Sequence, residues 1–283
     1  MHDDGPVLAD VVPYLVCPVC GAGLELADRA LLCPTGHTFD IARHGYANLL
    51  PGNARPGTAD TPEMVRARDE FLQAGHFTVP ADRLAWNVSR VRPSLVLDAG
   101  AGTGHYLSRA LDRSPDTIGL ALDISKHAAR RAAKAHPRVG SVVADLWRPL
   151  PLRTGAADTV INVFAPRNAA EFHRVLRDDG LLFTVTPSPR HLATLVEPLG
   201  LLSVDKHKTE RTDAALAGYF KLDSRQELET EAVLTHEEIV TLVGMGPSAH
   251  HVPPERLRER LERLSDPLPT PLSFVLSTYR RLE

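Results

Sequence analysis

The sequence lacks the features that would place the chain in a membrane or in a secretory pathway. It contains no apolar run long enough to span a bilayer. Its first residues, Met1-His-Asp-Asp, have neither the basic start nor the apolar stretch of a signal peptide. Its 35 acidic residues slightly outnumber its 32 basic ones, so any surface for nucleic acid has to be a local patch. We therefore expect a cytoplasmic protein that has no membrane partner.

Cysteine is scarce, with only three in the chain, and all of them lie in one short segment. An odd number in a cytosolic chain favours metal binding over disulfides. Cys17, Cys20, Cys33 and His37 have the spacing of a four-ligand zinc site. Four sulfur and nitrogen ligands leave no open coordination position, so the zinc would be structural. A module of this size has too small a hydrophobic core to fold without such a metal. The alternative is three buried cysteines and an unrelated histidine.

What the chain does contain is enough apolar sequence for a full domain. Its 283 residues are 43% hydrophobic, which suits one α/β domain and a smaller module. We divide the chain into a zinc-binding module at 1–50, a Pro/Gly-rich linker with helices at 51–92, and a large domain at 93–283. Within the small module, two short runs around 24–32 predict a hairpin. Within the large domain, the irregular region near 187–226 is interpreted as an insertion.

Strand and helix patterns alternate through the large domain, which predicts a parallel sheet with helices on both faces. Helices are expected at 60–72, 81–91, 105–113, 125–135, 168–177 and 236–243. Seven strands, the last pair antiparallel, are expected at 94–98, 117–123, 140–144, 158–163, 180–186, 227–234 and 270–280.

The most distinctive stretch of the large domain is a glycine loop at 96–106. An apolar strand leads into Asp98, and Gly100, Gly102 and Gly104 then alternate with small residues before a helix begins. Glycines allow the backbone to approach a ligand closely, and the first turn of a helix offers free N–H groups. The spacing does not match the Gly-x-Gly-x-x-Gly fingerprint of dinucleotide sites.

Acidic residues end the strands on either side of this loop. Asp123 ends the second strand, where a carboxylate can accept hydrogen bonds from ribose hydroxyls. Asp145 ends the third strand, where it can accept from an adenine amine, with Leu146 beside the ring. Asp98 can hold the loop or a ligand ammonium group. These acids suit a cationic adenosyl ligand, S-adenosylmethionine, better than a pyrophosphate; the alternative is a tight turn with acids that act only as caps.

The loop and its acids resemble those of class I methyltransferases, which have a Rossmann-like fold. From about 14 to 280 the chain resembles the 23S rRNA guanine-N1 methyltransferases, and within them the branch of tylosin-resistance enzymes. This resemblance is carried by Cys17-Pro-Val-Cys20 and by the stretches at 33–40, 45–50, 63–68, 71–77, 162–166, 186–192 and 245–249. It implies methylation of a guanine in hairpin 35 of 23S rRNA (position 748 or 745), a homodimer, and resistance to a macrolide.

The resemblance also implies roles for individual residues. It places zinc on Cys17, Cys20, Cys33 and His37, so that the small module would help to recognise RNA. It assigns cofactor contacts to His191, to Phe77, which replaces a tyrosine common in the family, and to the glycine loop. The loop contacts expected are Asp98, Gly100, Gly102, Thr103, Gly104, His105 and Tyr106.

Methyl transfer to guanine N1 also requires that the nitrogen lose its proton. Asn162, Asp145 and His191 follow strands and are candidates to steer or deprotonate the base, although His191 could equally serve only as cofactor packing. The target base has to leave its stack and meet apolar or aromatic groups. Phe77, Phe164 and Trp147 are candidates for the pocket wall, and for Trp147 we favour an ordinary core position.

Local groups of basic residues are candidates for RNA contact. The groups near the zinc module, which include Arg66 and Arg68, are favoured over the helix face at 126–134, which is expected only to cover the sheet. The full set is Arg43-His44, Arg55, Arg66, Arg68, 126–134, Lys206-His-Lys208, Arg211 and 256–260. Two other functions stay open at this point: a small-molecule methyltransferase of a natural-product pathway, and a non-catalytic RNA-binding protein.

Overall fold

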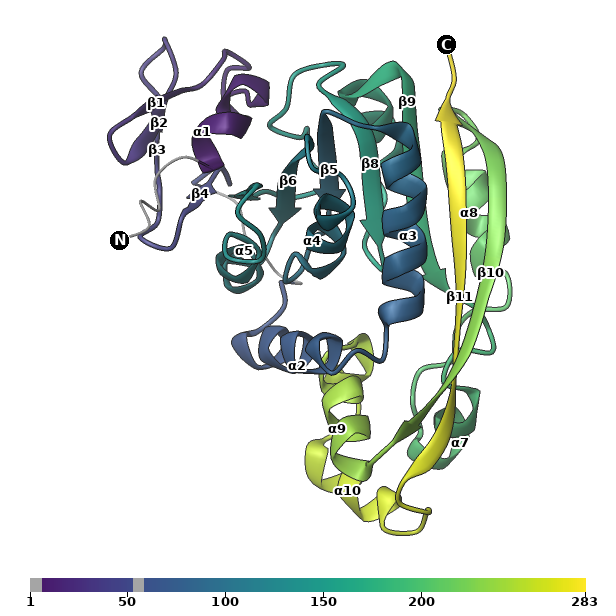
Figure 1. Cartoon of the computed structure of the whole chain (residues 1–283). Helices are drawn as coiled ribbons and strands as arrows, with labels where there is room; N and C mark the ends of the chain where they lie inside the picture. Colours follow the sequence, from purple (N-terminus) through teal and green to yellow (C-terminus); the bar gives the residue numbers. More distant parts are fainter. Residues whose placement is uncertain (1–6, 53–58) are drawn as a thin grey trace.

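A central sheet of eight strands runs through the computed structural model, which describes residues 7–52 and 59–283 (Figure 1). The strand order is β10-β11-β9-β8-β5-β6-β7-β4, parallel from β9 to β4 and antiparallel at β11 and β10. All seven predicted strands are present. The strands are β4 (Tyr46–Asn48), β5 (Leu95–Ala99), β6 (Ile118–Asp123), β7 (Val139–Val143), β8 (Ala157–Val163), β9 (Leu176–Pro187), β10 (Phe220–Leu234) and β11 (Leu268–Arg281).

The eighth strand, β4, was not predicted and comes from the N-terminal module. It pairs in parallel with β7, where Ala47 lies opposite Val142, and the Leu49 N–H continues the ladder to the Val143 carbonyl at 3.0 Å. A three-residue strand is too short to show a period in the sequence. The prediction of a seven-stranded sheet is therefore corrected to eight, and the last strand of the zinc module is part of the large sheet.

The rest of the N-terminal module is a small antiparallel sheet of β1 (Glu25–Ala27), β2 (Ala30–Leu32) and β3 (Thr38–Asp40). The predicted hairpin is confirmed as β1 and β2, joined by a turn in which Asp28 has φ 49°. The module is attached through α1 (Val7–Val11) and η1 (Val12–Tyr14), which are buried against the sheet. Val11 fits where Gly140 of β7 has no side chain, since a Cβ there would lie 2.4 Å from it.

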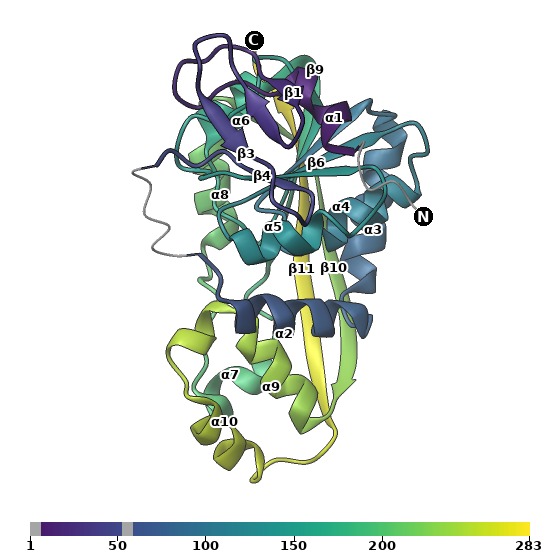
Figure 2. The ribbon, with the colours of Figure 1, turned by 90° about the vertical axis from the view of Figure 1, so that its left-hand side faces the viewer.

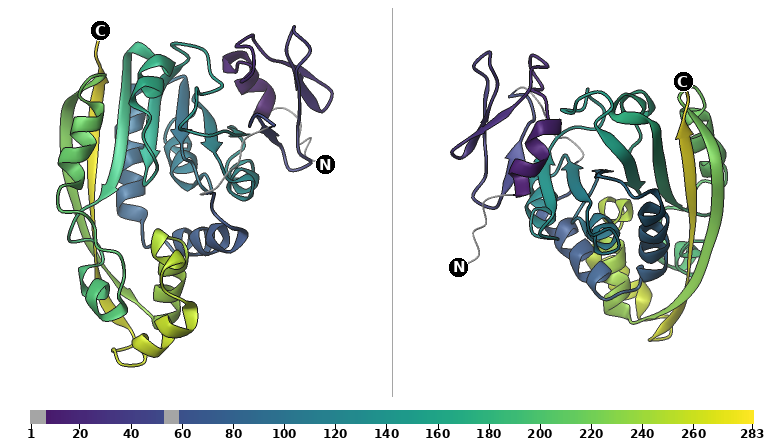
Figure 3. Two further views of the ribbon diagram at one scale, coloured as in Figure 1. Left: turned by 180° about the vertical axis from the view of Figure 1, so that it is seen from behind. Right: turned by 45° about the horizontal axis from the view of Figure 1, so that its top comes forward.

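Helices cover both faces of the large sheet, as predicted (Figure 3). Alternate residues of each strand enter opposite cores: Val96 packs with α3 and α4, whereas Leu97 packs on the face that α1 and α6 cover. This alternation places Asp98 on the same face as Val96. The helices of these layers are α3 (Thr78–Val91), α4 (His105–Asp112), α5 (Lys126–Ala132), α6 (Ala169–Val175) and α8 (Lys208–Leu216).

A second group of helices lies beyond the carboxyl ends of the parallel strands (Figure 2). Here α2 (Pro62–Gln73) packs against α9 (His236–Gly244), and η2 (Pro247–His250), α10 (Pro254–Leu261) and α7 (Ala193–Leu199) lie beside α9 and β11. Thr61 caps α2 by accepting from the Met64 N–H, and Thr235 and Glu238 form a reciprocal capping box on α9. His76 contacts Glu238 at 2.9 Å, which joins the end of α2 to α9.

The region expected to be an irregular insertion is shorter than predicted. It contains α7 and α8, but β10 already begins at Phe220. The first residues of β10 are mostly exposed on this edge strand, so they show no apolar alternation. In the described parts of the chain, no helix has the length and apolarity that crossing a membrane requires. Much of the predicted linker, with Arg55, lies at 53–58, outside the described residues.

Candidate functional site

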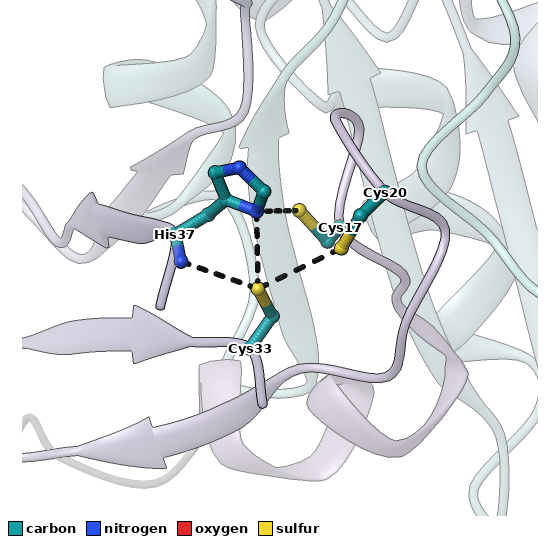
Figure 4. A group of neighbouring side chains, drawn as sticks. All are labelled: Cys17, Cys20, Cys33 and His37. Carbon is teal, nitrogen blue, oxygen red and sulfur yellow. Dashed lines mark hydrogen bonds between the residues drawn. The ribbon is translucent and has the colours of Figure 1, made fainter. Parts of the chain in front are cut away.

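The three cysteines and His37 meet in one cluster at the base of the small sheet (Figure 4). Their four ligand atoms all lie within 4.8 Å of one another. Cys20 Sγ lies 3.7 Å from Cys33 Sγ, and His37 Nδ1 lies 3.3 Å from Cys33 Sγ. A tetrahedral zinc site with Zn–S bonds of about 2.3 Å separates its sulfurs by about 3.8 Å. The donor set and its spacing therefore fit structural zinc, bound through Nδ1 of the histidine.

Thr35 belongs to this cluster, although it was not predicted from the ligand spacing. Its Oγ1 lies 3.1 Å from Cys20 Sγ, from Cys33 Sγ and from His37 Nδ1. Burial raises the pKa of Cys33, but hydrogen bonds from the Thr35 hydroxyl and the His37 N–H outweigh it and bring the pKa to about 6. These contacts favour the thiolate, which is the form that binds a metal.

The glycine loop joins β5 to α4, as predicted, and its three glycines all have positive φ (89°, 53° and 81°). Two of them are also needed because the protein packs closely around them. A Cβ on Gly100 would lie 2.3 Å from the Cβ of Ala165, and a Cβ on Gly104 would lie 3.0 Å from the Cα of Ala132. At Gly102 the nearest neighbour would instead be the side chain of Arg68, at 3.4 Å.

One cavity opens over this loop at the carboxyl ends of β5 to β8. Nine of the predicted cofactor residues line it: Phe77, Gly100, Gly102, Thr103, His105, Tyr106, Asp123, Asp145 and Leu146. Gly104, Asp98 and His191 were also predicted as cofactor contacts, but they lie outside the lining. The remaining lining residues were not predicted as cofactor contacts: Asp60, Arg68, Leu72, Ala101, Ile124, Trp147, Val163, Phe164, Ala165, Pro166 and Met245.

The acids of the site differ in their surroundings. Asp123 accepts from the Gly102 N–H and from the Ser125 N–H, both at 2.8 Å, and so holds the loop in place. Burial raises the pKa of Asp123, while these two hydrogen bonds oppose the change. Asp98 is fully buried, and neither of its oxygens has a hydrogen-bond partner among the described residues. Burial, with the charge of Asp123 adding to it, raises the pKa of Asp98 well above its usual range.

Asn162 and His191, the predicted catalytic residues, both lie behind the cavity wall. The side chain of Asn162 is fully buried, and its Nδ2 donates to the carbonyls of Ala99 at 2.8 Å and Pro166 at 2.9 Å. It ties the end of β8 to the end of β5, so the predicted direct contact with a base does not fit this placement. His191 packs on Phe274, with ring centroids 4.7 Å apart. Burial, with Lys208 adding to it, lowers the pKa of His191 to about 4.

Two exposed aromatic residues stand at the cavity. Trp147 is 67% exposed, so the expectation that it belongs to the core was wrong. Phe164 is 42% exposed and has φ 53°, in the left-handed region that non-glycine residues seldom adopt. It follows β8 and lies 6.2 Å, centroid to centroid, from both Phe77 and Tyr106. The cavity therefore has a polar side at the strand-end acids and an open aromatic side.

Two of the basic groups merge into one patch. The turn before β4 carries Arg43 and His44. The helix α5, which contacts β4, carries Arg130, and Lys134 lies in the turn just after α5. Burial lowers the pKa of His44, and the positive charges of Arg130, Arg43 and Lys134 lower it further. As expected, this helix covers the sheet, because Ala128, Ala129 and Ala132 are buried. Its exposed side lies beside the basic residues of the zinc module, and we call Arg43, His44, Arg130 and Lys134 together the basic patch.

Comparison with known proteins gives consistent results for both parts of the chain. The family model described as RlmA, N-terminal, a zinc ribbon, matches residues 15–56, and the model described as Methyltransferase domain matches residues 96–180. Among solved structures, a chain from the complex of the Haloferax volcanii Trm112 methyltransferase activator with a methyltransferase is similar in fold. Its TM-score is 0.51 at 17% identity, over 80% of this chain and 100% of that one.

Two relatives match nearly the entire length of the chain. A Streptomyces fradiae protein named 23S rRNA (guanine(748)-N(1))-methyltransferase is 47% identical, over 96% of this chain and 99% of its own. A Micromonospora griseorubida protein that carries the name 23S rRNA (guanine-N(1)-)-methyltransferase is 48% identical, over 96% and 98%. The chain therefore belongs to the family of S-adenosylmethionine-dependent 23S rRNA (guanine-N1)-methyltransferases.

Proposed function

We propose that this chain methylates N1 of a guanine in hairpin 35 of 23S rRNA, at the 748 position named for the Streptomyces fradiae relative. The observation that carries the proposal is the two-sided cavity: strand-end acids on one side, and exposed Trp147 and Phe164 on the other. A base swung out of its stack is held by such aromatic faces. When bound, the cofactor supplies the electrophilic methyl group of its sulfonium.

The residues of the acidic side fit the cofactor by their chemistry. Asp123 is held at the loop and has lone pairs left for ribose hydroxyls, and Asp145 lies beside Leu146, where an adenine ring would pack. Asp98 lies behind this lining, and its buried carboxyl has no partner among the described residues; a bound ammonium group near it would stabilise its charged form. Phe77 contributes ring packing to the same wall. Together these groups orient the cofactor, which is the main task in an in-line methyl transfer.

The roles proposed for Asn162 and His191 follow from their placement. Asn162 positions the segment that carries Phe164, because its amide holds the Pro166 carbonyl. His191 is neutral at pH 7 and is a weak proton acceptor, because its pKa is about 4. We infer that His191 supports the aromatic wall through Phe77 and Phe274 and does not take the proton from guanine N1.

The RNA backbone is proposed to contact the basic patch. Arg43, Arg130 and Lys134 are exposed, and each phosphate that they neutralise releases counterions. Replacing Arg130 and Lys134 by glutamate should weaken binding of a hairpin-35 RNA and flatten the dependence of its affinity on salt. Charge reversal of Arg256, which is exposed on α10, is the control. Equal effects of the two changes would remove the basic patch from the RNA interface.

The test of the acceptor uses labelled S-adenosylmethionine. The protein is incubated with 23S rRNA from a strain that lacks the modification and, separately, with small-molecule extracts of a natural-product producer. Label in the rRNA alone supports the proposal, whereas label only in a small molecule would reverse it. The homodimer stays a prediction, and macrolide resistance is checked by the drug susceptibility of a host that expresses the chain.

A further inference from the structure

Arg68 of α2 faces the cavity and not the solvent. Its side chain is 26% exposed, it forms an ion pair with Asp60, and its Nη2 donates to the Met245 carbonyl at 2.8 Å. Arg66, two residues earlier on the same helix, is exposed. Both arginines were predicted from the sequence as candidates for RNA contact. The structure separates them, because Arg68 lines the cavity over the glycine loop and Arg66 does not.

The charge of Arg68 is unusual for its surroundings. It is the one lysine or arginine among the described residues that line the cavity, where the acids are Asp60, Asp123 and Asp145. Burial lowers the pKa of His105, with Arg109 adding to the effect, so this histidine is neutral at pH 7. A ligand carboxylate in this acidic cavity needs a positive partner, and a guanidinium is the best one, since it can bind both carboxylate oxygens.

The backbone of the glycine loop offers few donors for such a carboxylate. The N–H groups of Gly100 and Ala101 both donate to the Leu122 carbonyl at 2.9 Å. The Gly102 N–H donates to Asp123 at 2.8 Å, and the Gly104 N–H donates to Ala101 at 2.9 Å. These four amides are already used within the protein. A negative group at the loop is therefore left with the uncharged N–H groups of the first turn of α4 and with the charged side chain of Arg68.

Arg68 lies within reach of the loop. A Cβ on Gly102 would lie 3.4 Å from its Cδ and 3.6 Å from its Nη1, so the guanidinium packs directly over this glycine. Asp60 holds the guanidinium there and is itself fixed, because its carbonyl accepts from the Ser125 hydroxyl at 2.8 Å. Burial raises the pKa of Asp123 and of Tyr106, which line the same cavity, and the charge of Arg68 opposes this rise in both.

We propose that Arg68 binds the α-carboxylate at the methionine end of the cofactor, while Asp60 keeps the guanidinium aimed at the loop. This deepens the cofactor site proposed above and rests on it. It also removes Arg68 from the RNA interface. Ligands that lack the carboxylate gain nothing from Arg68, so the residue sets a preference for the intact amino-acid end.

Isothermal titration calorimetry on the full, zinc-loaded chain tests this without RNA. The two probes are S-adenosylhomocysteine and its decarboxylated analogue, which keeps the adenosine, the sulfur and the amine. For Arg68→Met we expect the affinity for S-adenosylhomocysteine to fall about 10- to 100-fold, as for the loss of a charge-assisted pair. The affinity for the analogue should change less than about threefold. Arg66→Met, the matched control on the same helix, should change neither.

The ratio of the two affinities is the readout, because a general loss of the site lowers both. Arg68→Gln keeps a donor for the Met245 carbonyl and should shift the ratio in the same way, even where Arg68→Met folds poorly. Equal losses for the two probes, or no loss for either, would overturn the carboxylate role. Failure of the unmodified chain to bind either probe would overturn the cofactor site itself, and the RNA acceptor is tested separately by the label transfer above.

Discussion

Replacing Gly104 by alanine tests why the glycine loop has its sequence. Gly104 precedes α4 with φ 81° and lies against α5. An alanine Cβ there would lie 2.9 Å from the Cβ of Ala135 and 3.0 Å from the Cα of Ala132. The second contact is with backbone, which cannot move by rotation of a side chain. The third glycine of the loop is therefore expected to serve the packing of α4 against α5, and not a ligand.

Two costs add up in this variant. The left-handed conformation costs a residue with a Cβ about 1–2 kcal/mol. Overpacking a close contact costs about 1–3 kcal/mol more. The expected loss for Gly104→Ala is thus about 2–5 kcal/mol, a large share of the roughly 5–15 kcal/mol by which domains are usually stable.

Urea unfolding of the zinc-loaded protein measures this loss. Gly155→Ala is the matched control, because Gly155 also has positive φ (63°) and a Cβ there would have no heavy atom within 4 Å. The Gly155→Ala variant should lose only the cost of the left-handed backbone conformation, about 1–2 kcal/mol of unfolding free energy. A loss for Gly104→Ala no larger than that for Gly155→Ala would refute the packing argument.

Three further predictions concern the metal, the aromatic side of the cavity and pH. Metal analysis should find one zinc per chain. The Cys33→Ser variant should lose the metal, and its N-terminal module should unfold at a lower denaturant concentration. An unmodified chain that holds no zinc and is no more stable than Cys33→Ser would contradict this. Trp147→Ala should lower kcat/KM for RNA about tenfold, by loss of stacking, and leave the affinity for S-adenosylhomocysteine within about threefold; an effect on the cofactor alone would place Trp147 at the adenine. Burial, with Lys208, lowers the pKa of His191 from 6.5 to about 4, so the unfolded chain takes up this proton first as pH falls. Stability should therefore decline from pH 6.5 to 4, less steeply in His191→Gln, and equal slopes in urea unfolding at several pH values would disprove the burial of this histidine.

Patterns along the chain predict the elements of this fold well where they are long and regular. The seven strands of the large domain each carry enough apolar residues to show a period, and the helices expected at 60–72 and 236–243 are present as α2 and α9. The strand β4 cannot be predicted from local sequence, because its three residues become a strand only by pairing with β7, which is almost a hundred positions away. The start of β10 is not predicted for another reason: the residues there are exposed on an edge strand, so the sequence shows no apolar alternation.

The site divides in the same way. Ligand spacing predicts the zinc cluster, and strand ends predict Asp123 and Asp145, because these signals are local in sequence. Which way a side chain faces is decided by packing, and here the sequence misleads: Trp147 is exposed at the cavity and Arg68 turns inward. Asn162 looks catalytic after its strand, yet its side chain is fully buried and its Nδ2 donates to two backbone carbonyls.

Methylation of guanine N1 in hairpin 35 can be measured by primer extension on treated 23S rRNA. A methyl group on N1 blocks Watson–Crick pairing and stops reverse transcriptase. We expect a new stop at the 748 position that depends on S-adenosylmethionine. An uninterrupted transcript through hairpin 35, from rRNA that has nevertheless taken up label, would contradict it.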